Sequence, residues 1–375
     1  MSIAAAPSVD ASRAQACRVV VSGYYGFDNL GDELILQALL AHLRARGYHV
    51  TVLSAKPEQT ARRYQVEAIS RLDLAAIIPA IARCHLLISG GGGLFQDATG
   101  PASPIYYGGL ILLAAYFKIP VLLWAQGVGP LKTWLGRQMS ALAMRRCRHF
   151  LVRDAFSAAL IGDLTGREAE VTADPVWTLQ LPPRAKARAQ DVWQIGVSLR
   201  PWPDLTPERI RELAAFFRRL TDGAEKPVQF HLTPFQPQAD LDPLHAFADA
   251  LQAEGLRNIH WVSVNALLET IPQFHLMFGM RYHSLVLAML SHVPVYGLVY
   301  DPKVSQLLEG FHLQGVSIAQ IAHMDVDAIR AYFVRYQEPD LSALQRSAAI
   351  NFQRLDELLA YEMEEGEMVM DDIVI

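Results

Sequence analysis

The stretch HLMFGMRYHSLVLAML, residues 275–290, changes from one structural pattern to another within a few positions. An apolar strand pattern ends at Phe278, and a helical pattern begins at Ser284. Arg281 and His283 lie in the turn between them. The N-terminus of a helix attracts anions, and arginine adds a planar pair of donors for carboxylate or phosphate. Because histidine transfers protons near neutral pH, we expect an anion site with a proton donor here.

The same alternation of strand and helix runs along the chain and predicts an α/β fold. Near-continuous apolar strands joined by helices are typical of a parallel sheet covered on both faces. The expected strands are 18–22, 49–54, 85–89, 120–125, 149–152 and 170–172, then 194–199, 227–232, 258–262, 275–278 and 294–299. We therefore expect two doubly wound Rossmann-like domains that face a cleft, followed by a helical C-terminal tail.

The Pro- and Arg-rich segment 181–189 interrupts this alternation and is the expected linker. The predicted organisation is a disordered leader (1–16), an N-terminal Rossmann-like domain (17–185), a C-terminal Rossmann-like domain (186–325) and a helical tail with an acidic end (326–375). In such sheets, ligands bind beyond the carboxyl ends of the strands. The functional residues are therefore expected where strands end.

Composition narrows the classes of function. A net charge of −5 argues against broad binding to nucleic acid. Three widely spaced cysteines suggest a reducing compartment without a disulfide framework. The first residues carry no signal-peptide pattern, and the longest apolar run is interrupted by Lys118 and Pro120. We expect a cytoplasmic protein. No cluster of metal ligands appears, and we expect neither a metal nor a cofactor.

Three glycine-rich segments follow expected strands of the first domain. The first, residues 23–33, contains Gly26, Asn29 and Asp32 but lacks the spacing of a dinucleotide fingerprint. Two interpretations of Asp32 stay open: an N-terminal helix cap, or a base that meets a substrate hydroxyl. The later segments are the loop 90–97, with Gly92 and Gly93, and the strand exit at Gln126. They indicate either close approach to an acceptor or tight turns without a ligand.

Cations follow several other strands. Arg153 ends the fifth strand, Arg200 ends the first strand of the second domain, and Lys303 follows the last. For Arg153, an ion pair with Asp154 or a neighbouring loop acid is the alternative to a ligand contact. The basic run 132–153 is interpreted either as a solvated helix face or as a surface that contacts an anionic membrane.

Taken together, the motifs resemble the polysaccharide pyruvyl transferase family, and more closely its CsaB-type members. The resemblance rests on residues 23–33, 90–97, 126–130, 152–154, 279–285 and 300–303, which occur in this order. It implies a fold similar to GT-B glycosyltransferases. It also implies transfer of a pyruvyl group from phosphoenolpyruvate to two hydroxyls of one sugar, with release of phosphate. For CsaB-type members the implied acceptor is an N-acetylmannosamine residue of a lipid-linked wall-polysaccharide precursor.

The resemblance implies roles for Asp32, Arg153, His283 and Lys303. His283 and Asp32 are the expected catalytic residues. Phosphoenolpyruvate carries a carboxylate and a phosphate, and the residues expected to bind it are Arg153, Arg281, Lys303 and Arg200. Residues expected at the acceptor are Gly26, Asn29, Gly92, Gly93 and Gln126.

Two other interpretations of the sequence stay open. One is a GT-B glycosyltransferase that uses a sugar nucleotide, for which Glu309 is the only nearby acid to hold a ribose. The other is a non-catalytic sugar-binding protein on the same fold.

Overall fold

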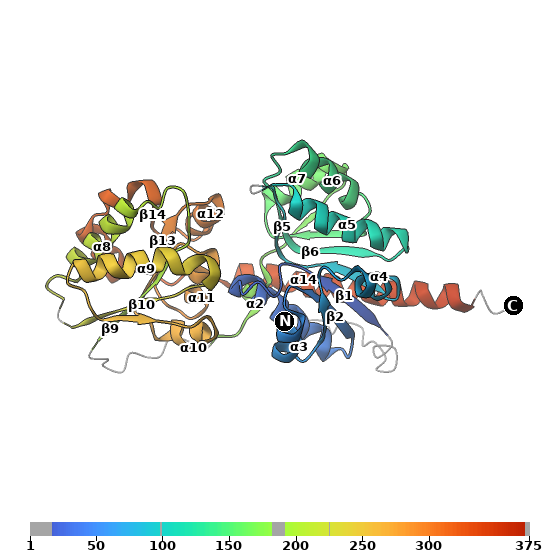
Figure 1. The fold of residues 1–375 in the computed structure, drawn as a ribbon, viewed down its shortest axis with the longest axis horizontal. Coiled ribbons are helices and arrows are strands. Elements are labelled where there is room, and N and C mark those ends of the chain that lie inside the picture. Colours follow the sequence, from blue (N-terminus) through green and yellow to red (C-terminus); the bar gives the residue numbers. More distant parts are fainter. Residues whose placement is uncertain (1–16, 98–99, 182–191, 225, 372–375) are drawn as a thin grey trace. The chain divides into compact units, whose positions relative to one another are not determined.

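Two parallel β-sheets, one in each of two compact units, form the framework of the protein (Figure 1). The computed structural model describes residues 17–97, 100–181, 192–224 and 226–371. The expected leader (1–16) and all but the first residue of the expected linker lie outside these residues. The chain divides at Thr178, and residues from Ser342 onward return to the first unit.

The first unit contains an eight-stranded sheet with the order β3-β2-β1-β4-β6-β7-β8, in which β5 pairs with β6. Its strands are β1 (Arg18–Ser22), β2 (His49–Ser54), β3 (Glu67–Ser70), β4 (Leu86–Ser89), β5 (Gly92–Phe95), β6 (Val121–Val128), β7 (His149–Val152) and β8 (Glu170–Val171). Its helices are α2 (Leu30–Ala45), α3 (Pro57–Tyr64), α4 (Leu74–Ala82), α5 (Ala102–Tyr116), α6 (Trp134–Met144), α7 (Ala155–Thr165) and α14 (Ser342–Asp371). All eight residues of β6 are buried, as expected for a central strand covered on both faces.

The C-terminal helix α14 belongs to the first unit rather than forming a separate tail. Asn351 is fully buried and fastens it: its side chain accepts a hydrogen bond from Thr172 (2.7 Å) and donates one to the carbonyl of Ala173 (2.8 Å). The indole of Trp124 on β6 donates to the Asn351 carbonyl (3.1 Å). One turn later, Asp356 lies 2.8 Å from His42 of α2. These buried polar contacts make α14 a structural layer of the first unit.

The second unit contains a six-stranded sheet with the order β11-β10-β9-β12-β13-β14. Its strands are β9 (Trp193–Ser198), β10 (Val228–Leu232), β11 (Ile259–Trp261), β12 (Leu276–Gly279), β13 (Val295–Val299) and β14 (Gly315–Ser317). Its helices are α8 (Pro207–Thr221), α9 (Pro237–Ala253), α10 (Leu267–Thr270), α11 (Tyr282–Leu290), α12 (Pro302–Gly310) and α13 (Val326–Val334). Phe217 centres its core, 4.8 Å from the ring of Phe278 and 5.3 Å from that of Phe230.

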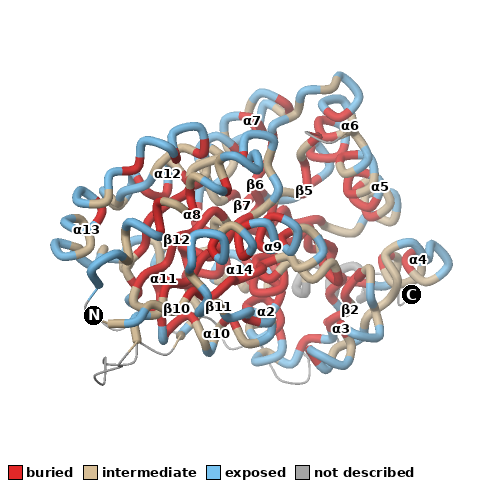
Figure 2. The backbone as a smooth tube through the Cα atoms, turned by 60° about the vertical axis from the view of Figure 1, so that its left-hand side comes forward, coloured by how far each residue is buried: buried red, intermediate tan, exposed pale blue. Residues whose placement is uncertain are grey.

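The expected fold class is confirmed, with strands β1, β2 and β7 at the expected bounds. In each unit the buried residues gather on the strands and the exposed ones on the outer helices (Figure 2). Three strands were not expected: β3, β5 and β14. Two are short edge strands without a run of apolar residues, and β5 begins within four consecutive glycines. Segment 90–97 was expected to be a loop. It contains the strand β5, because Gly92 pairs with Gln126 of β6.

Candidate functional site

Both sheets have a point at which the strand order reverses, and the predicted residues lie there. In the first unit the reversal is between β1 and β4, and in the second it is between β9 and β12. Ligands of open α/β sheets bind outside the carboxyl ends of the strands at such points. Asp32 and the four glycines follow β1 and β4, whereas Arg200, Arg281 and His283 follow β9 and β12. Each unit thus presents its own candidate site.

In the first unit, Asp32 lies in the first turn of α2 and is buried. The helix cap is Asn29, which has extended backbone angles and accepts a hydrogen bond from the N–H of Gly31 (3.2 Å). The interpretation of Asp32 as the cap is therefore wrong, because an earlier residue already fills that position. The Asp32 carboxylate instead contacts the backbone of Gly92, where the φ of +96° also favours glycine. Acidic residues in the first turn of a helix interact favourably with the helix dipole.

The glycines of this edge make room for side chains of the chain itself. The fully buried ring of Tyr25 lies against Gly23 and Gly90, where an added Cβ would overlap the ring. Gly26, with φ of +78°, lies against the turn after β2, and its N–H donates to Glu33 (2.8 Å). Burial raises the pKa of Tyr25 well above its usual value, and the charge of Asp32 raises it further. Tyr25 is therefore a neutral phenol next to Asp32, which sequence reasoning did not single out.

Gln126 and Asp97 hold the glycine segment in place. Gln126 is fully buried, and its amide donates to the carbonyl of Gly90 (3.1 Å). Asp97 accepts hydrogen bonds from the backbone N–H groups of Lys132 (2.6 Å) and Thr133 (2.7 Å). Burial alone would raise the pKa of Asp97, but these bonds and the Thr133 hydroxyl outweigh it and lower the pKa. The structure gives Gln126 a bracing contact, and its role at an acceptor stays a prediction, as do those of Gly26, Asn29, Gly92 and Gly93.

Arg153 follows β7, and its guanidinium lies over Gly127, where an added Cβ would be 2.8 Å from Nε. It forms an ion pair with Asp174 (3.2 Å) and lies 4.0 Å from Asp154. The ion pair with a neighbouring loop acid, which the sequence left open, is therefore present. Asp174 is almost fully buried. Since this pair links two strand ends that are distant in sequence, no local pattern could have revealed it.

In the second unit, Arg281 is held by an acid of α9. Its guanidinium lies 2.5 Å from the carboxylate of Asp240 and 3.2 Å from Oε1 of Gln236. Asp240 is fully buried and also accepts hydrogen bonds from the N–H groups of Phe235 (3.0 Å) and Gln236 (2.9 Å). Asp240 therefore orients Arg281 and joins the β10 exit to the β12 exit. Sequence reasoning missed it, because it lies forty-one positions away from Arg281.

Arg200 differs from the other two arginines because aromatic groups hold it. Its Nη1 donates to the hydroxyl of Tyr300 (3.0 Å), and its Cζ lies 4.9 Å from that ring and 5.8 Å from the ring of Trp202. Its backbone N–H donates to the sulfur of Met280 (3.4 Å), and the backbone N–H of Met280 donates to the carbonyl of Ser198 (2.9 Å). Among the described residues no carboxylate forms an ion pair with Arg200. The carboxyl ends of β9, β12 and β13 thereby meet around the positive charge of Arg200, which has no acidic partner in the described part of the chain.

His283 and Lys303 each occupy the second position of a helix that follows a strand of this edge. His283 is half-buried in α11, with its ring edge-on to Tyr282 at 5.2 Å. Lys303 is half-buried in α12, and its N–H donates to the capping residue Asp301 (2.8 Å). A positive side chain opposes the dipole at a helix N-terminus. Arg281, which is the N-cap of α11, has the same arrangement. A bound anion would offset this unfavourable interaction between the positive side chains and the helix dipoles.

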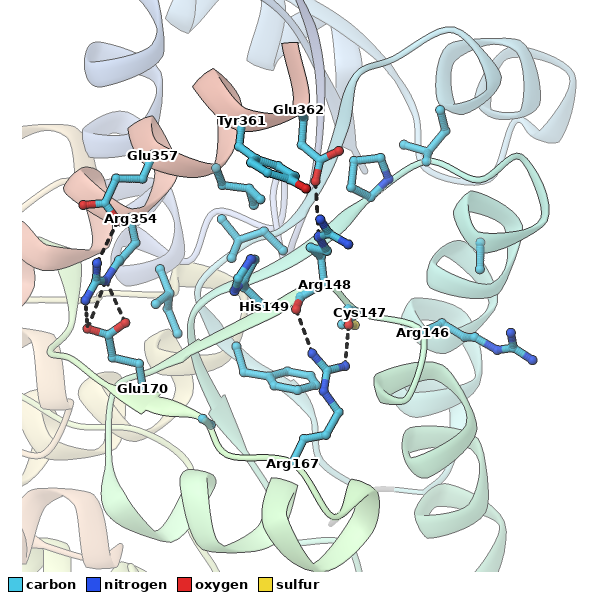
Figure 3. Close-up of a pocket in the computed structure, with 18 of the residues that line it drawn as sticks. Arg146, Cys147, Arg148, His149, Arg167, Glu170, Arg354, Glu357, Tyr361 and Glu362 are labelled. Atoms are coloured by element: carbon cyan, nitrogen blue, oxygen red, sulfur yellow. Dashed lines mark hydrogen bonds and ion pairs between the residues drawn. The ribbon is translucent and has the colours of Figure 1, made fainter. Parts of the chain in front are cut away.

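One cavity of the described surface lies away from these strand ends, and a second lies at one of them. One of about 1410 Å³ lies at the amino ends of β6 and β7, beside α14 (Figure 3). Several of its charged side chains form ion pairs with one another: Arg354 pairs with Glu170 (2.9 Å), and Arg148 pairs with Glu362 (3.4 Å). The other, of about 550 Å³, lies at the β13 exit and includes Tyr300 and Glu309 in its lining. No group of three or more His, Cys, Asp or Glu side chains within the described ranges is placed to hold a metal ion.

Comparison with known proteins identifies both a family and a fold. Residues 29–302 match the family described as polysaccharide pyruvyl transferase. A search of curated proteins gives no match. Among solved structures, the UDP-GlcNAc 2-epimerase of Methanocaldococcus jannaschii is similar, with a TM-score of 0.62 at 10% identity over 92% of this chain and 99% of that one. Alr3699/HepE of Anabaena, solved with UDP-glucose, has a TM-score of 0.57 at 11% identity over 95% and 100%. At these identities the likeness shows the fold alone.

Proposed function

Because the chain belongs to the polysaccharide pyruvyl transferase family, we propose that it transfers a pyruvyl group from phosphoenolpyruvate to two hydroxyls of a hexose. The product is a cyclic ketal on a cell-wall or surface polysaccharide precursor, and phosphate is released. Phosphoenolpyruvate acts as a co-substrate, and the reaction uses no cofactor or metal.

The observation that carries this proposal is the concentration of positive groups at one edge of the second sheet. Arg200 has aromatic rather than acidic neighbours, and Arg281 and Lys303 lie at helix N-termini. Phosphoenolpyruvate carries two anionic groups, and such an arrangement supplies charge-assisted donors to both. Backbone N–H groups at the start of α11 add further donors, since that helix has no side-chain cap bond.

In this proposal His283 and Asp32 carry out separate proton transfers. His283 gives a proton to the methylene carbon of phosphoenolpyruvate, which creates an oxocarbenium-like centre at the neighbouring carbon. One sugar hydroxyl attacks this centre while Asp32 accepts its proton. The C–O bond to phosphate breaks, and the second hydroxyl closes the ketal. Of the two hydroxyl protons, one balances the proton given to carbon, and the other leaves with the phosphate.

The acceptor proposed from the CsaB-type motifs is N-acetylmannosamine in a lipid-linked precursor. Its acceptor hydroxyls would meet Asp32, which is a buried carboxylate at the N-terminus of α2. An ionised carboxylate accepts hydrogen bonds from two hydroxyls without a change of charge. We place the protein in the cytoplasm, at the inner face of the cell membrane, where such a precursor is accessible.

The test measures phosphate release and the mass of the product. Purified protein with phosphoenolpyruvate and a saccharide panel should release phosphate and yield a pyruvylated sugar. His283→Ala should reduce this rate by a factor of about 10² to 10⁴. His312→Ala, in the same unit but outside the candidate site, is the matched control. If no saccharide is pyruvylated, or if His283→Ala turns over at the rate of the unchanged protein, the proposal fails.

A second candidate function rests on Glu309. This residue lines the 550 Å³ cavity at the β13 exit and accepts a hydrogen bond from Ser305 (2.5 Å). A carboxylate in such a place could hold the ribose of a sugar nucleotide, as a GT-B glycosyltransferase requires. Thermal shifts separate the two functions: phosphoenolpyruvate should raise the Tm, and UDP-sugars should not. The reverse ranking, with loss of the shift in Glu309→Ala, would favour the glycosyltransferase.

A non-catalytic saccharide-binding protein on the same fold is the third candidate. It would bind a saccharide of the panel and release no phosphate under any condition.

A further inference from the structure

A long segment of the first unit is strongly basic although the chain as a whole is acidic. Residues 98–153 contain seven Lys and Arg residues and no Asp or Glu, whereas the net charge of the chain is −5. The described part of this segment runs through α5, β6, α6 and β7. Because the strands are buried, its charge is presented by the helices and their ends.

The exposed face of α6 within this segment is apolar. Trp134 is 75% exposed, Leu142 47% and Leu135 42%. At about 100° per residue, these three positions span an arc of about 100° on the helix. Arg137 lies beside this arc, Arg146 follows the end of the helix by two residues, and both are exposed. Phe156, which is 59% exposed, begins α7 beside α6.

Trp134 differs from the exposed tryptophans of the second unit. Trp261 lies 4.4 Å from the ring of His245, and Trp193 is stacked on His275 at 6.1 Å. Trp134 has no ring partner within the described residues. A large aromatic side chain that is left in water in this way is unusual on a protein that acts alone. The surface formed by Trp134, Leu135, Leu142, Phe156 and the flanking arginines is named here the α6 surface.

We propose that the α6 surface docks on an anionic lipid bilayer. Tryptophan favours the interface between water and lipid, and the aliphatic side chains beside it would enter the acyl boundary. Arg137 and Arg146 would meet lipid phosphates, and no acid within residues 98–153 opposes this attraction. Figure 3 shows Arg146 extending away from the paired side chains of the cavity beside α14, which leaves its guanidinium available.

Charge favours a membrane over a second copy of the chain. In a two-fold interface the α6 surface would face itself, and Arg137 and Arg146 would then approach their own copies. Four exposed apolar side chains are also few for a stable interface, which needs about 800 Å² on each partner. An anionic bilayer instead complements both the cations and the apolar centre. This inference does not rest on pyruvyl transfer, although it would bring the enzyme to a lipid-linked acceptor.

The experiment is sedimentation of the full chain with vesicles of phosphatidylcholine alone or mixed with phosphatidylglycerol. We expect binding to the mixed vesicles only, weakened by salt. Trp134→Ala should weaken it, and Arg137→Glu with Arg146→Glu should weaken it about tenfold or more. The matched controls in the second unit are Trp261→Ala and Arg257→Glu, which should bind like the unchanged protein. Circular dichroism and Tm show that each variant folds.

Three results would overturn the inference. The first is equal sedimentation with both kinds of vesicle, or with neither. The second is unchanged binding by Trp134→Ala and the double arginine variant. The third is a dimer in light scattering, or binding to single-stranded RNA, that these substitutions abolish while vesicle binding is absent. Pyruvylation of a soluble saccharide, measured on the same variants, should be unchanged, so that failure of docking and failure of the proposed function are told apart.

Discussion

The carboxyl edges of the two sheets share a topology but differ in the charged groups that gather there. At the edge of the first unit lie the buried acids Asp32, Asp97 and Asp174, with glycines that accommodate them and Tyr25. At the edge of the second unit lie Arg200, Arg281, His283 and Lys303. Carboxylates accept hydrogen bonds from hydroxyls, whereas guanidinium and ammonium groups bind anions. In the proposed function, Asp32 of the first unit meets the sugar, and Arg200, Arg281 and Lys303 of the second unit bind the donor.

A second difference concerns how each arginine is held. Arg153 and Arg281 each pair with a buried aspartate, so their charge is largely compensated within their own unit. Arg200 is held by Tyr300 and Trp202 instead. Although the sequence placed Arg200 last among the phosphoenolpyruvate-binding residues, this geometry makes it the strongest candidate for a direct charge contact.

The largest expected effect is on the buried pair of the second unit. Asp240→Ala leaves the Arg281 guanidinium without its acid and removes the acceptor of the Phe235 and Gln236 N–H groups. Breaking a buried pair in this way costs about 3–5 kcal/mol of unfolding free energy. Urea denaturation measures the change. The matched variant Asp242→Ala changes an exposed acid of the same helix and should stay within about 0.5 kcal/mol. A loss below about 1 kcal/mol in Asp240→Ala would show that Asp240 does not fix Arg281.

The next effect separates donor from acceptor recognition. Arg200→Ala should raise the Kd for phosphoenolpyruvate by a factor of about 10 to 150, because a hydrogen bond to a charged group contributes about 1.5–3 kcal/mol. Asp32→Asn, in the first unit, should leave this Kd unchanged and lower kcat. Calorimetric titration and steady-state kinetics measure the two quantities. If Asp32→Asn weakens phosphoenolpyruvate as much as Arg200→Ala does, the division between the units is wrong.

A smaller effect is expected at the glycine that faces Asp32. Gly92→Ala places a side chain against the Asp32 carboxylate at a φ of +96°. The backbone conformation alone costs about 1–2 kcal/mol, and displacement of Asp32 should also lower kcat. Gly166→Ala is the control, since that residue has a φ of +71° with nothing within 4 Å. It should lose stability without losing activity. Equal kcat in both variants would argue against a role for the position of Asp32.

Local sequence was sufficient for most of the fold. Strands such as β1, β2 and β7 are runs of apolar residues bounded by polar ones, and their parallel pairing follows from the helices between them. It was also sufficient to locate Arg281 and His283 near a change from strand to helix, although α11 begins at Tyr282 rather than at Ser284 and includes His283. The roles of the two residues stay predictions. Local sequence could not reveal Asp240, Asp174 or Tyr25. Their roles depend on which strands become neighbours, and that is decided by packing over tens of residues.

A last effect, which depends on pH, is the response of the second unit to acid. Burial, together with the smaller effect of the nearby His260, lowers the pKa of His231 on β10 from 6.5 to about 4. Between these values the unfolded chain binds a proton that the folded chain does not. Stability should therefore be constant with respect to this group above pH 6.5 and fall as the pH drops towards 4. The slope is at most about 1.4 kcal/mol per pH unit for one proton. His231→Gln should flatten the dependence in this window, whereas His323→Gln, an exposed control, should not. Urea midpoints at pH 7, 6, 5 and 4.5 measure it. Parallel curves for His231→Gln and the unchanged protein would mean that His231 takes up a proton as readily in the folded unit as in the unfolded chain.

At the edge of the first unit, Asp97 has a lowered pKa, so its contribution to the free energy of unfolding should persist to a lower pH and be lost only below about 3.8. The two edges should therefore respond to acid in different windows.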